Sequence, residues 1–263
     1  MTSEEIKVTV EKRGHILLMG LNRADKRNAV DIEMFNQLAH AYAQLENDDD
    51  LRCGVLFAHG DHFTGGIDLA QWASLFEAGD ALKPPENSID PLGINGKRVS
   101  KPVVCALQGF CITIGIEFLL ACDIRIAARN TRFMQIEIKR GIYPVGGATI
   151  RFMHEVGWGN AMRYLLTGDE FSAEDAYRMG LIQEVVDNGE QLNRAIQIAE
   201  TIAEQAPLGV YATLKSSRII MDAIEAQAKA SLMPDLVPLM KSEDTAEGVQ
   251  SFIERRKANF KGR

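Results

Sequence analysis

Several short apolar runs, each ending at a turn signal, limit the folds that this chain can adopt. Three of them cover residues 15–21, 53–58 and 102–107. Runs of this length, bounded by Asn or Gly, predict buried strands. Residues 31–46 lie between the first two runs, and their apolar side chains recur at the spacing of one helix face. Strands that alternate with helices predict an α/β fold.

The second half of the chain predicts more helix. Ser172 to Asp175 has the pattern of a capping box, which opens a helix that ends near Gly180. Residues 207–263 predict a helical region that Pro234 and Pro238 interrupt and that resumes over residues 244–257. We therefore expect a core of residues 1–206 that contains the site, followed by a helical region of residues 207–263.

Residues 79–96 contain Gly at both ends and three prolines between them. This composition predicts a mobile loop able to cover a site.

Charge and cysteine content narrow the function classes. The chain has 263 residues, and 29 Lys and Arg against 36 Asp and Glu give a net charge of −7, which argues against nucleic acid as the main partner. The four cysteines lie in apolar runs without CxxC spacing, which predicts buried thiols. The first residues lack the pattern of a signal peptide, and no apolar run is long enough for a bilayer, so we expect a cytoplasmic protein without membrane contact.

Two carboxylates lie in unusually apolar surroundings. Glu117 lies within Ile114-Gly-Ile-Glu-Phe-Leu119, and Glu137 follows 20 positions later between two isoleucines. A carboxylate removed from water is paired, exposed on a helix face, or functional. A buried pair can divide proton donation and acceptance. Spacing alone also permits two unrelated surface residues.

A glycine-containing loop and a basic loop precede two of the predicted helices. Residues 59–69, HGDHFTGGIDL, contain adjacent glycines whose backbone N–H groups can face a ligand, although an ordinary turn explains the same pattern. His59 and His62 lack further metal ligands at suitable spacing, so we expect no metal site. The basic residues of the loop 22–29 could bind phosphate groups, or they could be an ordinary run of charges exposed to solvent.

Taken together, these segments resemble the crotonase (enoyl-CoA hydratase/isomerase) superfamily over essentially the whole chain. The resemblance rests on residues 21–30 (LNRADKRNAV), 63–69 (FTGGIDL) and 101–109 (KPVVCALQG), followed in order by Glu117, Ala121-Cys-Asp123, Glu137, Gly141 and Pro144. It is especially close in the terminal stretch 244–262, DTAEGVQSFIERRKANFKG.

The resemblance implies a spiral of ββα units with a C-terminal helical region that builds homotrimers, often paired into hexamers. It also implies an acyl-CoA thioester substrate and no separate cofactor, since CoA is part of the substrate. Whether the assembly is a trimer or a hexamer, and which acyl group is bound, stay open.

The resemblance also implies site residues. The amides of Ile67 and Ile114 are expected to form an oxyanion hole. Glu117 is expected to activate water, and Glu137 to protonate the α-carbon. Residues implied near CoA are Lys26, Arg27, Ala29, Gly65, Ile67, Asp68 and Leu69, together with Phe260 and Lys261, which are expected to reach a CoA bound by a neighbouring subunit.

The chain departs from the family pattern at two places. Thr113-Ile114-Gly115 stands where the family usually has three glycines, and Pro144-Val-Gly-Gly-Ala148 replaces a more glycine-rich segment. The β-branched side chain of Ile114 is expected to narrow the passage for the thioester.

The leading prediction is a hydratase-like lyase that adds water to an α,β-unsaturated acyl-CoA through an enolate. An isomerase that moves the double bond needs only the carboxylate at the position of Glu137. A non-catalytic or RNA-binding protein on the same fold is the alternative from another class.

Overall fold

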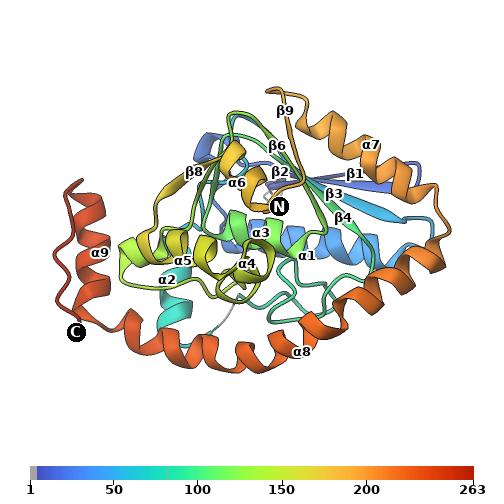
Figure 1. Cartoon of the computed structure of the whole chain (residues 1–263). Coiled ribbons are helices and arrows are strands. Elements are labelled where there is room, and N and C mark those ends of the chain that lie inside the picture. Colours follow the sequence, from blue (N-terminus) through green and yellow to red (C-terminus); the bar gives the residue numbers. More distant parts are fainter. Residues whose placement is uncertain (1–4, 81) are drawn as a thin grey trace.

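A six-stranded sheet forms the centre of the computed structural model, which describes residues 5–80 and 82–263 (Figure 1). The strand order is β1-β2-β3-β4-β6-β9. Strands β1 and β2 pair antiparallel, whereas the remaining neighbours in this sheet are parallel. The strands are β1 (Val8–Arg13), β2 (Ile16–Leu21), β3 (Cys53–Ala58), β4 (Val103–Leu107), β6 (Ile124–Ala128) and β9 (Glu184–Val186).

A smaller sheet lies beside the first and contains β5 (Phe110–Ile112), β7 (Arg132–Met134) and β8 (Glu170–Ser172). Strand β5 pairs parallel with β7, and β8 pairs antiparallel with β7. Consecutive strands β4 and β5 therefore belong to different sheets, as do β6 and β7. This alternation gives the predicted spiral of ββα units, so the α/β fold class is confirmed.

Helices cover both faces of the large sheet. On one face, α7 (Gln191–Ala203) packs Ala195, Ala199 and Ala203 against apolar side chains of β2, β3, β4 and β6. The opposite face packs in the main core against α1 (Ile32–Asn47) and α3 (Ile114–Ala121). The helices α2 (Leu69–Glu77), α4 (Ala148–Val156), α5 (Trp158–Thr167) and α6 (Ala173–Met179) also precede α7, as do the 3₁₀ turns η1 (Ala24–Lys26) and η2 (Glu137–Arg140).

Side chains cap the starts of two predicted helices. Ser172 and Asp175 form a reciprocal capping box, and α6 ends at Gly180 in the left-handed region. The predicted capping box is therefore confirmed, because capping depends on residues that are close in sequence. At the start of α1, the Asp31 side chain accepts a hydrogen bond from the N–H of Met34, a cap that was not predicted.

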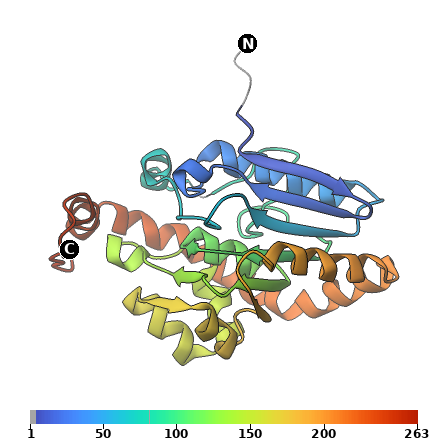
Figure 2. The ribbon, with the colours of Figure 1, turned by 90° about the horizontal axis from the view of Figure 1, so that it is seen from above.

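The long helix α8 (Pro207–Met240) corrects one prediction. It continues through Pro234 and Pro238 and ends only before Ser242, which caps α9 (Glu243–Ile253). Leu232 and Leu236 lie one turn apart, and both are buried in the core. Their packing offsets the backbone hydrogen bonds that the prolines remove. Helix α8 runs along the molecule and carries α9 to the end opposite α7 (Figures 1 and 2).

The described part of the segment 79–96 has no regular secondary structure, but it is anchored. The carboxylate of Asp90 accepts hydrogen bonds from the N–H groups of Leu92, Ile94 and Asn95. Leu82, Leu92 and Ile94 are buried in the core. Mobility of this segment stays a prediction.

Within the described residues, no helix combines the length and apolar character needed to cross a bilayer.

All four cysteines are buried free thiols.

Candidate active site

A cavity of about 380 Å³ lies between the two sheets' connecting loops and the C-terminal helices. Its wall includes residues of η1, the loop before α2, the end of β5, α3 and η2, as well as Leu236 of α8 and Val249 and Phe252 of α9. Both predicted glutamates, Glu117 and Glu137, line it. The fold therefore brings together two carboxylates that come from different ββα units.

Glu117 lies in α3, a short helix whose eight residues are all buried. Its Oε1 accepts hydrogen bonds from the N–H of Gly146 at 2.7 Å and from the N–H of Ala148 at 3.3 Å. Burial raises the pKa of Glu117 to about 7, against the opposing effects of these two bonds and of the positive charge of Arg151. The carboxyl group is therefore able to exchange a proton near neutral pH.

Glu137 opens η2 and faces the same cavity. The amide Nε2 of Gln135 donates a hydrogen bond to its Oε1 at 2.9 Å. Its Oε2 is buried and has no hydrogen-bond partner among the described residues. Burial, and next the negative charge of Glu117, raise the pKa of Glu137 well above the usual range. Both causes favour the protonated form of Glu137.

The two predicted amide donors come from different segments, the loop before α2 and the start of α3. Ile67 lines the cavity and follows Gly66, while Ile114 is the first residue of α3. The N–H groups of Ile67 and Ile114 take part in none of the hydrogen bonds within residues 5–80 and 82–263. Two amides without a partner beside a carboxylate pair suit the oxygen of a polarised carbonyl.

The structure changes the interpretation of Ile114. Its side chain is 1% exposed, belongs to the hydrophobic core and does not line the cavity. The expectation that Ile114 narrows the passage is therefore wrong, because the first turn of α3 directs this side chain inward. Thr113, one residue earlier, lines the cavity instead.

Most of the residues predicted near CoA border the cavity, namely Lys26, Arg27, Ala29, Gly65, Ile67 and Leu69. Asp68 does not, and its carboxylate pairs with Arg23 at 3.0 Å. Phe260 lines a neighbouring hollow, and the N–H of Lys261 donates to Asp244. Their role at a neighbouring subunit stays a prediction.

The basic loop is fixed by a residue that the sequence did not single out. Asn28 is fully buried, and its side-chain amide donates to the carbonyl groups of His59 and His62. Asn28 thereby ties the loop of Lys26 and Arg27 to the loop that leads to Ile67. The left-handed φ of 53° at Asn28 is one that asparagine tolerates better than most residues.

Sequence reasoning missed the groups that hold the glutamates. Gly146 has the clearest signal, since a Cβ at this position would lie 2.7 Å from Cδ of Glu117. The adjacent glycines at 146 and 147 were visible in the sequence, but their contact with α3 was not. Gln135, two residues before Glu137, gave no local signal for its hydrogen bond.

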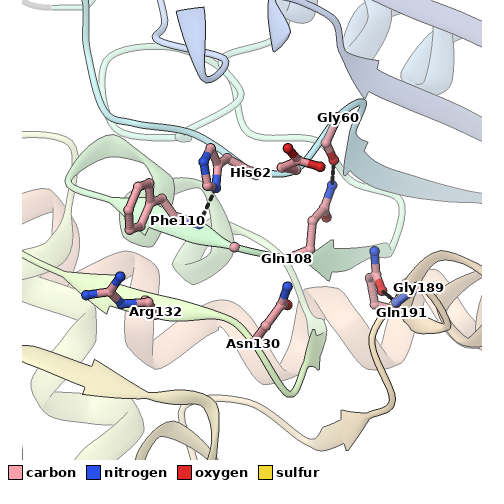
Figure 3. A pocket seen from close by; sticks show the side chains of 10 residues that line it. Gly60, His62, Gln108, Phe110, Asn130, Arg132, Gly189 and Gln191 are labelled. Atoms are coloured by element: carbon pink, nitrogen blue, oxygen red, sulfur yellow. Dashed lines mark hydrogen bonds between the residues drawn. The ribbon is translucent and has the colours of Figure 1, made fainter.

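A second hollow of about 400 Å³ lies near the cavity and is shown in Figure 3. Three of its polar side chains are engaged within the protein: Gln108 donates to the carbonyl of Gly60, Gln191 accepts from the N–H of Gly189, and Nδ1 of His62 accepts from the N–H of Phe110. The other loop histidine, His59, shares a hydrogen bond with Thr9. The described residues contain no cluster of three or more His, Cys, Asp or Glu suited to a metal ion.

The spiral fold places two carboxylates from different parts of the chain on the wall of one cavity. The family model described as enoyl-CoA hydratase/isomerase matches residues 11–263. The chain therefore belongs to the enoyl-CoA hydratase/isomerase family.

Individual relatives agree with this assignment. The enoyl-CoA hydratase EchA19 of Mycobacterium tuberculosis is 35% identical over 257 residues, which cover 97% of this chain and 96% of the relative. Among solved structures, a probable enoyl-CoA hydratase/isomerase from Mycobacterium abscessus is 47% identical with a TM-score of 0.79, covering 98% of this chain and 99% of the other. Carnitinyl-CoA hydratase from Mycobacterium avium is 31% identical with a TM-score of 0.86, and the match covers 98% of this chain and 100% of the other. These relatives support enzymatic, hydratase-like function.

Proposed function

We propose that the protein adds water across the α,β-double bond of an acyl-CoA thioester, with Glu117 and Glu137 as the acid–base pair. The observation that carries this proposal is that both carboxylates lie on the wall of one cavity, near segments whose amides, those of Ile67 and Ile114, have no partner among the described residues. Double-bond migration is less favoured, because it needs one carboxylate and the named relatives above include hydratases.

The first step is activation of water. Glu117 in its ionised form takes a proton from a water molecule, which attacks the β-carbon as the C=C π electrons move toward the thioester. Its pKa of about 7 suits a base that works near neutral pH. The amides of Gly146 and Ala148 hold Oε1 in place, which leaves Oε2 to face the water.

Negative charge then develops on the thioester oxygen, where the amides of Ile67 and Ile114 stabilise it. Protonated Glu137 next delivers its proton to the α-carbon, and the enolate electron pair forms the new C–H bond. The high pKa of Glu137 keeps this proton available. The proton on Glu117 returns to Glu137 or to solvent before the next turnover.

Substrate binding follows from the rest of the wall. Lys26 and Arg27 supply positive charge for CoA phosphates, and the apolar residues Phe76, Leu82 and Leu236 surround the acyl group. Ile219 and Ile220 of α8, together with Phe252 and Ile253 of α9, are exposed apolar side chains. They support a homotrimer or homohexamer as part of the proposal. Location in the cytoplasm stays a prediction.

The test is a panel of enoyl-CoA thioesters of different length and branching. Hydration is followed by loss of the conjugated thioester absorbance, and the product is identified by its mass gain of one water. We expect Glu117→Gln and Glu137→Gln each to lose about 10²–10⁴ in rate. Glu200→Gln, on the exposed face of α7, is the control and retains activity.

Two results contradict the proposal. One is the absence of any mass gain with every thioester. The other is conversion of a 3-enoyl-CoA to its 2-enoyl isomer with Glu117→Gln as active as the wild type, which indicates an isomerase.

A further inference from the structure

Thr113 adopts a backbone conformation that β-branched residues rarely occupy. Its φ is 50° and its ψ is −111°. A non-glycine residue in such a region is strained and persists only where the surroundings impose it. The N–H of Thr113 donates to the carbonyl of Met134, and its own carbonyl accepts from Ile116 and Glu117. Hydrogen bonds on both sides therefore fix this conformation at the start of α3.

The hydroxyl group of Thr113 is the second unusual feature. Oγ1 is buried, and it has no hydrogen-bond partner among the described residues. A buried hydroxyl left without a partner destabilises the fold, because it has lost its hydrogen bonds to water. A valine at the same place fills a similar volume without that cost. Neither the strain nor the unpaired hydroxyl is explained by packing.

The Thr113 hydroxyl lies close to the two chain segments that carry the amides of Ile67 and Ile114. Oγ1 lies 2.6 Å from the point where a Cβ on Gly66 would stand, so it lies against Gly66. Gly66 directly precedes Ile67, and Thr113 directly precedes Ile114. The hydroxyl therefore lies beside the chain segments that carry both free N–H groups, on a residue that lines the cavity.

We propose that the Thr113 hydroxyl donates a third hydrogen bond to the thioester oxygen that the amides of Ile67 and Ile114 bind. This inference rests on the proposed function, and it assigns a catalytic residue at a position that carries a hydroxyl in place of glycine. Rotation about the Cα–Cβ bond of Thr113 turns Oγ1 from Gly66 without moving the backbone. The substrate oxygen then supplies the acceptor that the described residues do not provide.

Four variants separate the hydroxyl from the shape of the side chain. Thr113→Val keeps the shape and removes the donor, whereas Thr113→Ser keeps the donor. Thr113→Gly removes both the donor and the backbone strain. Thr201→Val makes the same substitution on the exposed face of α7, where the hydroxyl bonds the carbonyl of Gln197.

We expect Thr113→Val and Thr113→Gly to lower kcat/KM for hydration by about 10² through kcat, since loss of one oxyanion donor has an effect of this size. Thr113→Ser stays within a few-fold of the wild type, and Thr201→Val is unchanged. Thr113→Gly is at least as stable to urea as the wild type, because glycine adopts this conformation without strain. Lower activity in a protein of equal stability excludes misfolding as the cause.

A spectroscopic measurement tests the contact directly. Butanoyl-CoA labelled with ¹³C at the thioester carbon has no double bond to hydrate, so its bound carbonyl resonance reports polarisation alone. We expect a downfield shift on binding to the wild type and to Thr113→Ser, and a smaller shift with Thr113→Val.

Two outcomes are distinct. If the wild type hydrates enoyl-CoA, and Thr113→Val matches it in rate and in carbonyl shift, the role of Thr113 is wrong while the proposed function stands. If the wild type hydrates no thioester, the proposed function itself fails.

Discussion

Replacement of Glu117 by glutamine removes an ionisable group from the buried helix α3 and keeps its packing. The glutamine Oε1 still accepts hydrogen bonds from the N–H groups of Gly146 and Ala148. The variant therefore differs from the wild type chiefly in that position 117 no longer titrates. We predict that the variant loses hydration and also becomes more stable than the wild type as the pH rises.

The sign follows from the direction of the pKa shift. Burial raises the pKa of Glu117 from its ordinary value of 4.5 to about 7. Between these values the unfolded chain releases the proton and the folded chain retains it, so the wild type loses stability as the pH rises through this window. Above pH 7 the Glu117 carboxyl group is ionised in both the folded and the unfolded state, and the full loss of folding stability from burying this charge is present.

The magnitude follows from the size of the shift. Each pKa unit corresponds to about 1.4 kcal/mol, so the shift is equivalent to about 3 kcal/mol in the free energy of unfolding. Most of this difference develops between pH 5 and pH 8. Glu117 is only 3% exposed, so solvent screening does not reduce the effect much.

The assay is urea unfolding of the wild type and Glu117→Gln at pH 5, 6, 7 and 8, followed by far-UV circular dichroism. We expect the difference in free energy of unfolding to move in favour of the variant by about 2–3 kcal/mol from pH 5 to pH 8. Glu200→Gln is the control, and its difference from the wild type stays constant. A pH-independent difference for Glu117→Gln refutes the argument that burial controls this carboxyl group.

Three further predictions concern the groups around the glutamates and one buried ion pair. Gly146→Ala places a Cβ against the Glu117 carboxyl, so the rate of hydration falls at least about 10²-fold while the CD spectrum stays native. An unchanged kcat contradicts this prediction. Gln135→Leu removes the hydrogen bond that lowers the pKa of Glu137, so the alkaline limb of the bell-shaped pH–rate profile moves to higher pH. If this limb stays in place, Gln135 does not influence the proton donor. Arg151→Met leaves the buried Glu225 without the partner that it bonds at 2.6 Å, so we expect the free energy of urea unfolding to fall by about 3–5 kcal/mol. The double variant Arg151→Met with Glu225→Leu recovers part of this loss. An equal loss in the single and the double variant contradicts the pairing.

The sequence by itself determined the features that depend on neighbouring residues. Alternating apolar runs and helical patterns predicted the α/β fold and the helix α1, and the capping box at Ser172 located the start of α6. The apolar surroundings of Glu117 and Glu137 marked both as candidate acids or bases. These signals depend on hydrophobic periodicity and on local hydrogen bonds, which a linear sequence displays.

Only the tertiary structure decided how these residues act together. It brought Glu117 and Glu137 into one cavity, and it placed the amides of Gly146 and Ala148 on the first of them. It kept α8 helical through Pro234, because burial of Leu232 and Leu236 outweighs a local preference. It also directed the side chain of Ile114 into the core and left Thr113 on the cavity wall, since a helix start fixes which of two adjacent side chains faces inward. Contacts between segments far apart in sequence set these outcomes, and no local pattern encodes them.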